Sequence, residues 1–348
     1  MVPGIGPHTG RQLVRACGAA GRIWQHPDEW RDIDGIGPRL TAALKNNAAG
    51  PAEEIIAGCQ RQSIAVLCPD DEAWPERLHG IEDAPLVLFA RGNVKHLNHD
   101  SMLAVVGARR ASREGRLIAR RWCRYLSAQG IGIVSGMAYG IDTAAHAGAL
   151  EATAPTIAVL GSGLLAAFSP EQQRQMDAIA TQGCVISEFL PDTPPRPEHF
   201  PRRNRIIAAL AEATCVIEAD IRSGSLITAR QAAEYGREVF AVPGSVLGGL
   251  HAGCHQLIRD GAVLAESAAD ILRHMAWKQY RSGPGKSYVP AGEQEAAVIA
   301  ALKQNIHHLD SLAEICDLTV PELSPILLAL ELQGVIERLP GSRYALLS

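Results

Sequence analysis

Between residues 101 and 275 the chain alternates short apolar runs with longer amphipathic stretches. The apolar runs are rich in β-branched side chains and mostly uninterrupted, as expected for strands that are covered on both faces. The stretches between them are rich in Ala, Arg, Glu and Leu and predict helices. This alternation predicts a parallel sheet with helices on both faces. The predicted strands are Met102–Val106, Ile131–Val134, Thr156–Leu160, Cys184–Ser187, Thr214–Glu218, Val239–Val242 and Ala262–Leu264.

Further apolar runs precede this region, within residues 60–100. Ser63–Cys68 and Leu86–Ala90 predict short strands, and Asp70–Leu78 predicts a helix or turn. Pro, Asp and Gly residues flank these runs, as is common at the ends of strands. We therefore expect residues 60–100 to lead into the sheet.

A small helical module is expected at residues 1–59. It contains two Gly-Ile-Gly turns, within Pro3–Pro7 and Asp34–Pro38, and each turn ends at a proline that can start a helix. The pattern is similar to the helix-hairpin-helix element of sterile-alpha-motif-like (SAM-like) modules, in which the glycine backbone can approach a DNA phosphate. A tight interhelical turn without a ligand explains the pattern equally well.

Residues 291–348 have a winged-helix pattern, and residues 276–290, rich in Ser, Gly and Pro, form a linker before it. Predicted helices at Glu293–Gln304, from Asp310 and at Thr319–Gln333 precede a hairpin around Pro-Gly-Ser. Such domains usually read duplex DNA. Here acidic residues outnumber basic ones, and the expected recognition helix, Thr319–Gln333, has no Lys or Arg. Because phosphate contacts dominate DNA affinity, we expect a protein-contact or regulatory role.

Charge and composition exclude several classes of protein. The net charge is −4 over 348 residues, so nucleic-acid binding would have to come from a local basic patch. No apolar run is long enough to span a bilayer and the N-terminus has no signal-peptide pattern, so we expect a soluble, cytoplasmic protein without a membrane partner. The eight cysteines form no C-x-x-C pair, which predicts reduced core thiols and no zinc site.

The segments that follow the predicted strands indicate the chemistry, because binding sites in such sheets lie beyond the carboxyl ends of the strands. Glycines there allow close backbone approach, and hydroxyls and helix N-termini donate to phosphate oxygens. Several such loops at one edge predict a polyanion site. No G-x-G-x-x-G fingerprint follows the first strand, so no nicotinamide or flavin cofactor is expected. The loops are Gly107–Ser112, Ser135–Asp142, Gly161–Gly163, Arg222–Ser225 and Pro243–Ser245.

The stretch His199–Thr228 is the most informative of all. Arg202, Arg203 and Arg205 crowd the start of a helix whose first position is expected at Pro201. A helix N-terminus carries roughly half a positive charge, and each cation placed there costs about 0.3–1 kcal/mol. Arginines at this end therefore predict a bound anion, above all a phosphate.

Helical spacing assigns these arginines to different faces. Arg202 and Arg205 are three residues apart and share a face, which we expect to meet the ligand. Arg203 should point elsewhere and pair with an acid such as Glu188 or Glu218.

Other side chains near these loops are also candidates for ligand contact. Arg109 and Arg110 are adjacent on a turn and should diverge, so we expect Arg109 alone to face the ligand. Phe200 and Tyr139 are candidates for stacking on nucleic-acid bases.

No catalytic constellation accompanies the predicted site. Asp142 and His146 are four residues apart and could meet on one helix face, but capping by Asp142 and core packing of His146 are the simpler interpretation. Glu188 has no visible partner for acid–base chemistry. We therefore expect a binding protein that is not an enzyme and holds no cofactor or metal.

Five ordered motifs stand out along the chain, namely Val106–Arg109, Ser135–His146, Phe200–Ile207, Arg222–Thr228 and Val242–Gly244. These motifs resemble those of the DprA (Smf) family of DNA-processing proteins. The resemblance is strong over residues 60–275, and the flanking units also suit the family. It implies an extended Rossmann-like α/β core between a SAM-like N-terminal domain and a winged-helix C-terminal domain.

The resemblance also implies a function and partners. The family binds single-stranded DNA without strong sequence preference, protects it, helps to overcome single-strand-binding protein, and loads the recombinase RecA during natural transformation. It dimerises through the Rossmann core. Its pocket uses the arginine of a G-[SA]-R motif, here Arg109, and basic residues of an F-P-x-R-N-R motif, here Arg202, Arg203 and Arg205; the second arginine, Arg110, departs from the pattern. The candidate DNA-binding residues are Gly107, Arg109, Arg110, Ser135, Gly136, Phe200, Arg202, Arg203, Asn204, Arg205, Ser223, Gly224, Ser225 and Thr228.

Alternative functions remain open at this point. Rossmann-like phosphoribohydrolases, similar to the lysine-decarboxylase-like proteins, also bind a nucleoside monophosphate at a sheet edge, and Glu188 or Asp142 would then be catalytic. The P-G-G-x-G-T loop of that family is absent, and Arg222–Ser225 stands in its place. A winged-helix transcription regulator is a third possibility, which the acidic C-terminal unit disfavours.

Overall fold

The computed structural model divides the chain into two compact units, Met1–Tyr280 and Arg281–Ser348. The division predicted from the sequence, with a separate module at 1–59, a core at 60–275 and a linker at 276–290, stays a prediction. Most of that linker lies outside the described residues. The structure describes residues 4–18, 20–23, 30, 33, 35–46, 50–277, 290, 292–304, 308–332, 335–339 and 341–346.

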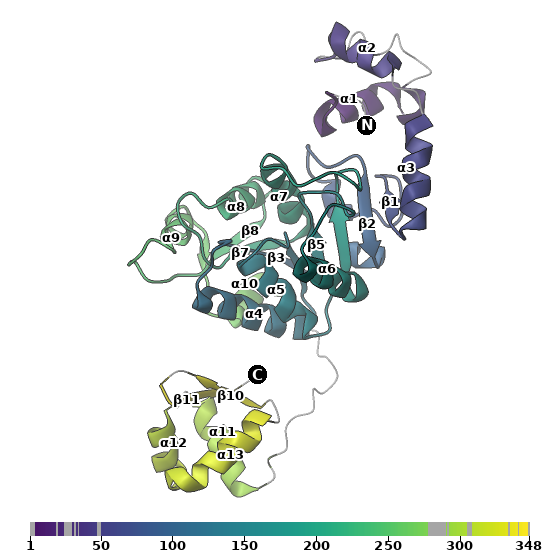
Figure 1. Cartoon of the computed structure of the whole chain (residues 1–348). Coiled ribbons are helices and arrows are strands. Elements are labelled where there is room, and N and C mark those ends of the chain that lie inside the picture. Colours follow the sequence, from purple (N-terminus) through teal and green to yellow (C-terminus); the bar gives the residue numbers. More distant parts are fainter. Residues whose placement is uncertain are drawn as a thin grey trace. The chain divides into compact units, whose positions relative to one another are not determined.

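Within the described residues, the larger unit contains nine strands in one sheet, in the order β1-β2-β6-β5-β4-β3-β7-β8-β9 (Figure 1). The strands β1 and β2 are antiparallel to their neighbours, and the pairs from β6 through to β9 are parallel. The mixed α/β fold with a large parallel sheet is therefore confirmed. The strands are β1 Ala65–Leu67, β2 Leu88–Gly92, β3 Met102–Val106, β4 Gly132–Ser135, β5 Thr156–Val159, β6 Cys184–Ser187, β7 Ala213–Val216, β8 Glu238–Ala241 and β9 Val263–Leu264.

The predicted strands match the observed ones to within one or two residues at each end. β2 lies two residues later than predicted at both ends, and β7 ends at Val216 rather than at Glu218. Glu218 forms hydrogen bonds outside the strand ladder. Its carbonyl oxygen accepts the backbone N–H of Ala108 at 2.6 Å, and its carboxylate accepts both the N–H and the hydroxyl of Ser112. These bonds tie the end of β7 to the loop that follows β3.

The order of the strands reverses next to β3. From β3 the chain adds β4, β5 and β6 towards one edge of the sheet, and it then returns to place β7 on the other side of β3. Loops that leave the carboxyl ends of β3 and β7 consequently diverge and leave a crevice between them. This point of reversal is where a doubly wound sheet is expected to bind its ligand.

Helices cover both faces of the sheet. One layer packs on the strand side chains that include Leu103, Val105 and Ile133, and this face continues through Ala158. The other layer packs on the face that includes Val134 and Ile157. The first layer consists of α4 Arg113–Ala128, α5 Ile141–Leu150, α6 Pro170–Gln182 and α10 Ala268–Met275, and the second of α7 His199–Leu210, α8 Ser225–Glu234 and α9 Ala252–Arg259.

The N-terminal part of this unit is helical, with α1 Pro7–Cys17, α2 Pro38–Asn46 and α3 Gly50–Arg61. Gly4 and Gly35, which open the two Gly-Ile-Gly turns, have φ values of 86° and 85°, a conformation that favours glycine. Pro3 and Asp34 of these motifs lie outside the described residues. The turns therefore have the expected backbone, and a DNA-binding role for them stays a prediction.

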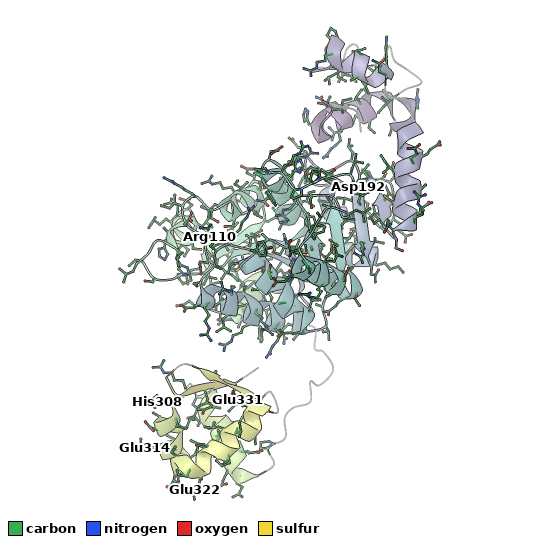
Figure 2. The ribbon with its side chains drawn as sticks, in the orientation of Figure 1. Arg110, Asp192, His308, Glu314, Glu322 and Glu331 are labelled. Atoms are coloured by element: carbon green, nitrogen blue, oxygen red, sulfur yellow. The ribbon has the colours of Figure 1, made fainter. Side chains whose placement is uncertain are left out.

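The smaller unit contains the expected elements of a winged helix. Three helices, α11 Glu293–Lys303, α12 Leu309–Ile315 and α13 Val320–Leu332, precede the antiparallel hairpin of β10 Ile336–Leu339 and β11 Arg343–Leu346. Acidic side chains are exposed on this unit, and Figure 2 labels some of them. The acids exposed among its described residues are Glu293, Asp310, Glu314, Asp317, Glu322 and Glu331.

In the part of the chain that the structure describes, no helix has the length and apolarity needed to cross a membrane.

Close packing between α4 and α5 gives a testable consequence. A Cβ atom added to Gly148 would lie 2.0 Å from the carbonyl oxygen of Arg120, so Gly148→Ala must push the two helices apart. We expect a loss of about 1–3 kcal/mol in the free energy of unfolding, measured by urea denaturation. Gly58→Ala in α3 is the matched control, because its nearest neighbour is a flexible arginine end at 3.8 Å and alanine is the better helix former. Equal effects of the two substitutions would contradict this packing.

Candidate functional site

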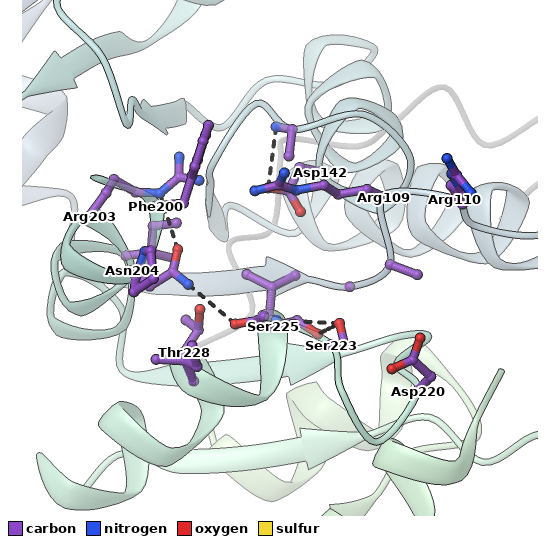
Figure 3. A pocket seen from close by; sticks show the side chains of 18 of the residues that line it. Arg109, Arg110, Asp142, Phe200, Arg203, Asn204, Asp220, Ser223, Ser225 and Thr228 are labelled. Carbon is purple, nitrogen blue, oxygen red and sulfur yellow. Dashed lines mark hydrogen bonds between the residues drawn. The ribbon is translucent and has the colours of Figure 1, made fainter. Parts of the chain in front are cut away.

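A cavity of about 650 Å³ lies at the point where the strand order reverses. Its walls come from the loop after β3, the loop after β4, the helix α7 and the turn that leads into α8 (Figure 3). These segments are far apart in the sequence and meet because the carboxyl ends of parallel strands lie at one edge. Many of the candidate residues line this cavity, namely Gly107, Arg109, Arg110, Phe200, Arg203, Asn204, Ser223, Gly224, Ser225 and Thr228.

The helix α7 presents one defined face to the cavity. Phe200, Arg203, Asn204 and Ile207 line it, and their spacing of three, one and three residues is that of a single helix face. The helix begins at His199, two residues before the predicted start, which does not change which residues share a face. The cavity-facing side of α7 therefore contains Arg203 and excludes Arg202 and Arg205.

Arg203 is buried, with 3% of its surface exposed, and its Nη1 and Nε donors are paired with protein oxygens. It donates to the carbonyl oxygen of Gly136, the residue after β4, and to that of Val159, the last residue of β5. Its Nε donates to Asn204 Oδ1 at 3.2 Å. Burial lowers the pKa of its guanidinium to about 10, the carboxylate of Asp142 opposes this shift, and the guanidinium of Arg109 adds to it. Arg203 is therefore still a cation at neutral pH.

The acid pairing predicted for the α7 arginines is wrong, because Glu188 pairs with Arg205 and Arg202 rather than with Arg203. Arg205 is the buried arginine that pairs with Glu188, with Nη2 2.7 Å from Oε2, and its Nε lies 3.3 Å from Asp83. Arg202 contacts the same Glu188 oxygen at 3.0 Å and is partly exposed. The two arginines do share a face, as spacing predicts, but that face is turned towards Glu188 and not towards the cavity.

Two further candidates, Ser135 and Gly136, are structural in this protein. The hydroxyl of Ser135 is fully buried and donates to the carbonyl oxygen of Val105 at 2.6 Å. Gly136 donates its N–H to Asp142 and accepts from Arg203. A Cβ on Gly136 would lie 2.5 Å from the Arg203 guanidinium. Both residues hold the cavity wall in place and do not line the cavity.

Arginine and aromatic side chains cover each other on one side of the cavity. The guanidinium of Arg109 lies over the ring of Phe200 at 4.5 Å from its centroid, a cation–π contact. Gly161, after β5, packs against the same ring, since a Cβ there would lie 2.9 Å from it. The expectation that only Arg109 turns towards the site is wrong, because Arg109 and Arg110 both line the cavity. The Phe200 contact orients Arg109.

Polar groups of the loop after β7 form the opposite wall. The hydroxyls of Ser223 and Ser225 are 2.7 Å apart, and Ser225 is the first residue of α8. The amide of Asn204 donates to the carbonyl oxygen of Gly224 at 3.3 Å, which joins this turn to α7. Hydroxyls beside a helix N-terminus provide donors for a phosphate oxygen.

Asp142 lines the cavity as well, although the sequence favoured a helix cap at this position and Asp142 was not among the DNA-binding candidates. Its carboxylate accepts the N–H groups of Gly136 at 3.1 Å and Ala138 at 3.4 Å, and 6% of its surface is exposed. Burial raises its pKa to about 6, against the opposing effects of Arg203, of these two N–H groups and of Arg109. It holds the loop after β4 in shape and titrates near neutral pH.

His146 is packed in the core, as predicted. It is fully buried, and its Nδ1 lies 2.7 Å from the hydroxyl of Thr156. Burial lowers its pKa to about 3, so it is neutral at physiological pH. Among the described residues, no group of three or more His, Cys, Asp or Glu side chains is arranged to hold a metal ion.

Comparison with known families agrees with this architecture. The family model for DNA recombination-mediator protein A matches residues 65–276, and the model for the DprA winged helix domain matches residues 284–342. Protein Smf of Escherichia coli K12 is 39% identical over 297 residues, which cover 83% of this chain and 79% of that protein. DNA processing protein DprA of Streptococcus pneumoniae is 46% identical over 202 residues, covering 58% and 71% respectively.

Solved structures show the same fold. The X-ray structure of DprA from Streptococcus pneumoniae superposes with a TM-score of 0.65 at 36% identity, covering 77% of this chain and 98% of that one. A structure of DNA processing protein A from Helicobacter pylori, solved for its single-stranded DNA binding mode, gives a TM-score of 0.55 at 27% identity and covers 61% and 95%.

The raised pKa of Asp142 predicts a pH dependence of stability. The native state holds this proton more tightly than the unfolded chain, so the stabilisation is present below pH 4 and is lost as the pH rises through about 6. Relative to Asp142→Asn, the wild-type free energy of unfolding should fall by up to about 3 kcal/mol between pH 4 and pH 7, measured by urea denaturation. The lowered pKa of His146 acts in the opposite direction in both proteins and cancels in the difference. A difference that stays constant with pH would contradict the assignment.

Proposed function

The chain belongs to the DNA recombination-mediator protein A family, also called DprA or Smf, and on this basis we propose that its α/β core binds single-stranded DNA without strong sequence preference. The observation that carries the proposal is the cavity between β3 and β7. It combines the cations of Arg109 and Arg203 with the hydroxyls of Ser223 and Ser225 beside a helix N-terminus. These are the groups that bind a phosphate backbone.

The polar groups of the cavity favour backbone binding over base reading. Asn204 is of a type that reads adenine in other proteins, but its Oδ1 accepts from Arg203 and its Nδ2 donates to Gly224. Its amide is therefore already engaged. The Nη1 and Nε groups of Arg203 likewise donate to protein oxygens. Arg203 therefore contributes mainly its positive charge to the binding of a phosphate. A site of this kind binds many sequences with similar affinity.

The proposal extends to recombination. A strand held in this way would be protected and passed to RecA during DNA uptake, with single-strand-binding protein as a further partner and with two copies pairing through the core. The support is the family resemblance and the description of the matching family as a recombination mediator. The exposed acidic side chains of the smaller unit favour a protein contact for that unit.

Asp142 supports a second candidate function, the hydrolysis of nucleoside monophosphates. A cavity-lining carboxyl with a pKa near 6 suits proton transfer at neutral pH. Glu188, the other acid considered, does not line the cavity and is paired with two arginines. Incubation with nucleoside monophosphates, followed by chromatography for free base and ribose phosphate, tests this function. We expect no release, whereas release that is lost in Asp142→Asn would establish a hydrolase instead.

Fluorescence anisotropy of labelled oligo-dT across a salt series tests the main proposal. Each neutralised phosphate of a single strand contributes about −0.7 to the slope of log affinity against log salt. We expect binding that weakens steeply as salt rises. Weak binding that does not change with salt would refute the proposal.

Arg109→Ala should reduce the affinity for oligo-dT by about tenfold, because one charge-assisted hydrogen bond is lost. It should also reduce the salt slope by roughly one phosphate contact. The matched control is Arg174→Ala, an exposed arginine on α6 outside the cavity. Equal affinities of these two variants would show that the cavity is not the binding site.

A further inference from the structure

Tyr139 is an exposed aromatic residue in a loop that contributes to the cavity wall. It lies between Ala138 and Gly140 in the loop that joins β4 to α5, and Ala138 lines the cavity. Its side chain is 56% exposed. Within the described residues, no hydrogen bond or ring contact holds that side chain.

The backbone that carries Tyr139 is fixed on both sides. Ala138 donates its N–H to Asp142 at 3.4 Å, and its carbonyl oxygen accepts both the N–H and the hydroxyl of Thr143 at 3.1 and 2.8 Å. Gly140 has a φ of 87°, and a Cβ there would lie 2.3 Å from the carbonyl oxygen of Ala108. The backbone of the loop that carries Tyr139 is therefore rigid. A rigid backbone reduces the conformational entropy that is lost when Tyr139 binds a partner.

The loop also holds the backbone beside Tyr139 close to the backbone of Arg109. Gly140 packs against the backbone of Ala108 and Arg109, and the N–H of Ile141 donates to Ala108 at 3.3 Å. The segment that holds Tyr139 and the segment that holds Arg109 are thus one packed surface.

Phe200, whose ring lines the cavity, is partly covered by neighbouring residues. Phe200 is half-buried, the Arg109 guanidinium lies over it at 4.5 Å, and Gly161 packs against it. Its role is to orient Arg109. Of these two rings, Tyr139 is the one with an open face.

We propose that Tyr139 stacks against an unpaired base of the strand whose phosphates the cavity binds, so this inference rests on the proposed function. Every base has a π-face, so such a contact adds affinity without adding strong sequence preference. Tyrosine also loses little side-chain entropy when it is immobilised. The base occupies the exposed side of the ring while the backbone enters between β3 and β7.

The test compares three substitutions at one position against two probes. The variants are Tyr139→Phe, Tyr139→Leu and Tyr139→Ala, and the probes are oligo-dT and an oligonucleotide of the same length with abasic sites throughout. On oligo-dT, the Phe variant should bind like wild type, and the Leu and Ala variants should bind about fivefold more weakly or worse. On the abasic probe, all four proteins should bind alike. Leu117→Ala on α4, another exposed apolar side chain, is the matched control and should change neither affinity.

Each other outcome overturns the inference. Equal binding of oligo-dT by wild type and Tyr139→Ala would show that the ring contacts no base. An equal loss on both probes would show a backbone contact, and a Leu variant that binds like Phe would show an apolar contact without stacking. If wild type itself fails to bind oligo-dT, the proposed function fails first, and this result is distinct from any effect of Tyr139.

Discussion

The burial of one guanidinium, that of Arg203, determines the geometry of the site. A charge removed from water is costly unless its donors are paired, and here the partners are carbonyl oxygens at the ends of β4 and β5. These bonds fix α7 against the strand ends. They also leave no room for a side chain at Gly136. The position of α7 then decides which residues face the cavity.

Two acidic residues complete this arrangement in different ways. Glu188 neutralises the face of α7 that points away from the cavity, through Arg205 and Arg202. Asp142 lies on the cavity side, where it shapes the loop after β4 and offsets part of the charge of Arg203. The arginines at the start of α7 are therefore partly compensated within the protein, and the cations that line the cavity are those of Arg109, Arg110 and Arg203.

The sequence was sufficient to predict the strands of the sheet and the edge of the sheet at which the site lies. Apolar runs such as Met102–Val106 and Cys184–Ser187 predict their strands correctly because both faces are buried. Parallel strands then place their following loops together, which is why Gly107, Ser223 and Phe200 could be grouped in advance. The orientation of α7 could not be predicted. Spacing shows that Arg202 and Arg205 share a face, but the direction of that face depends on Glu188, which comes from another loop.

The structure of the protein bound to a short oligo-dT tests the central claim most directly, because it locates the strand. The account predicts phosphate oxygens between β3 and β7, within hydrogen-bond distance of Arg109 and of the hydroxyls of Ser223 or Ser225. A strand that lies along another surface, with this cavity empty, would contradict it.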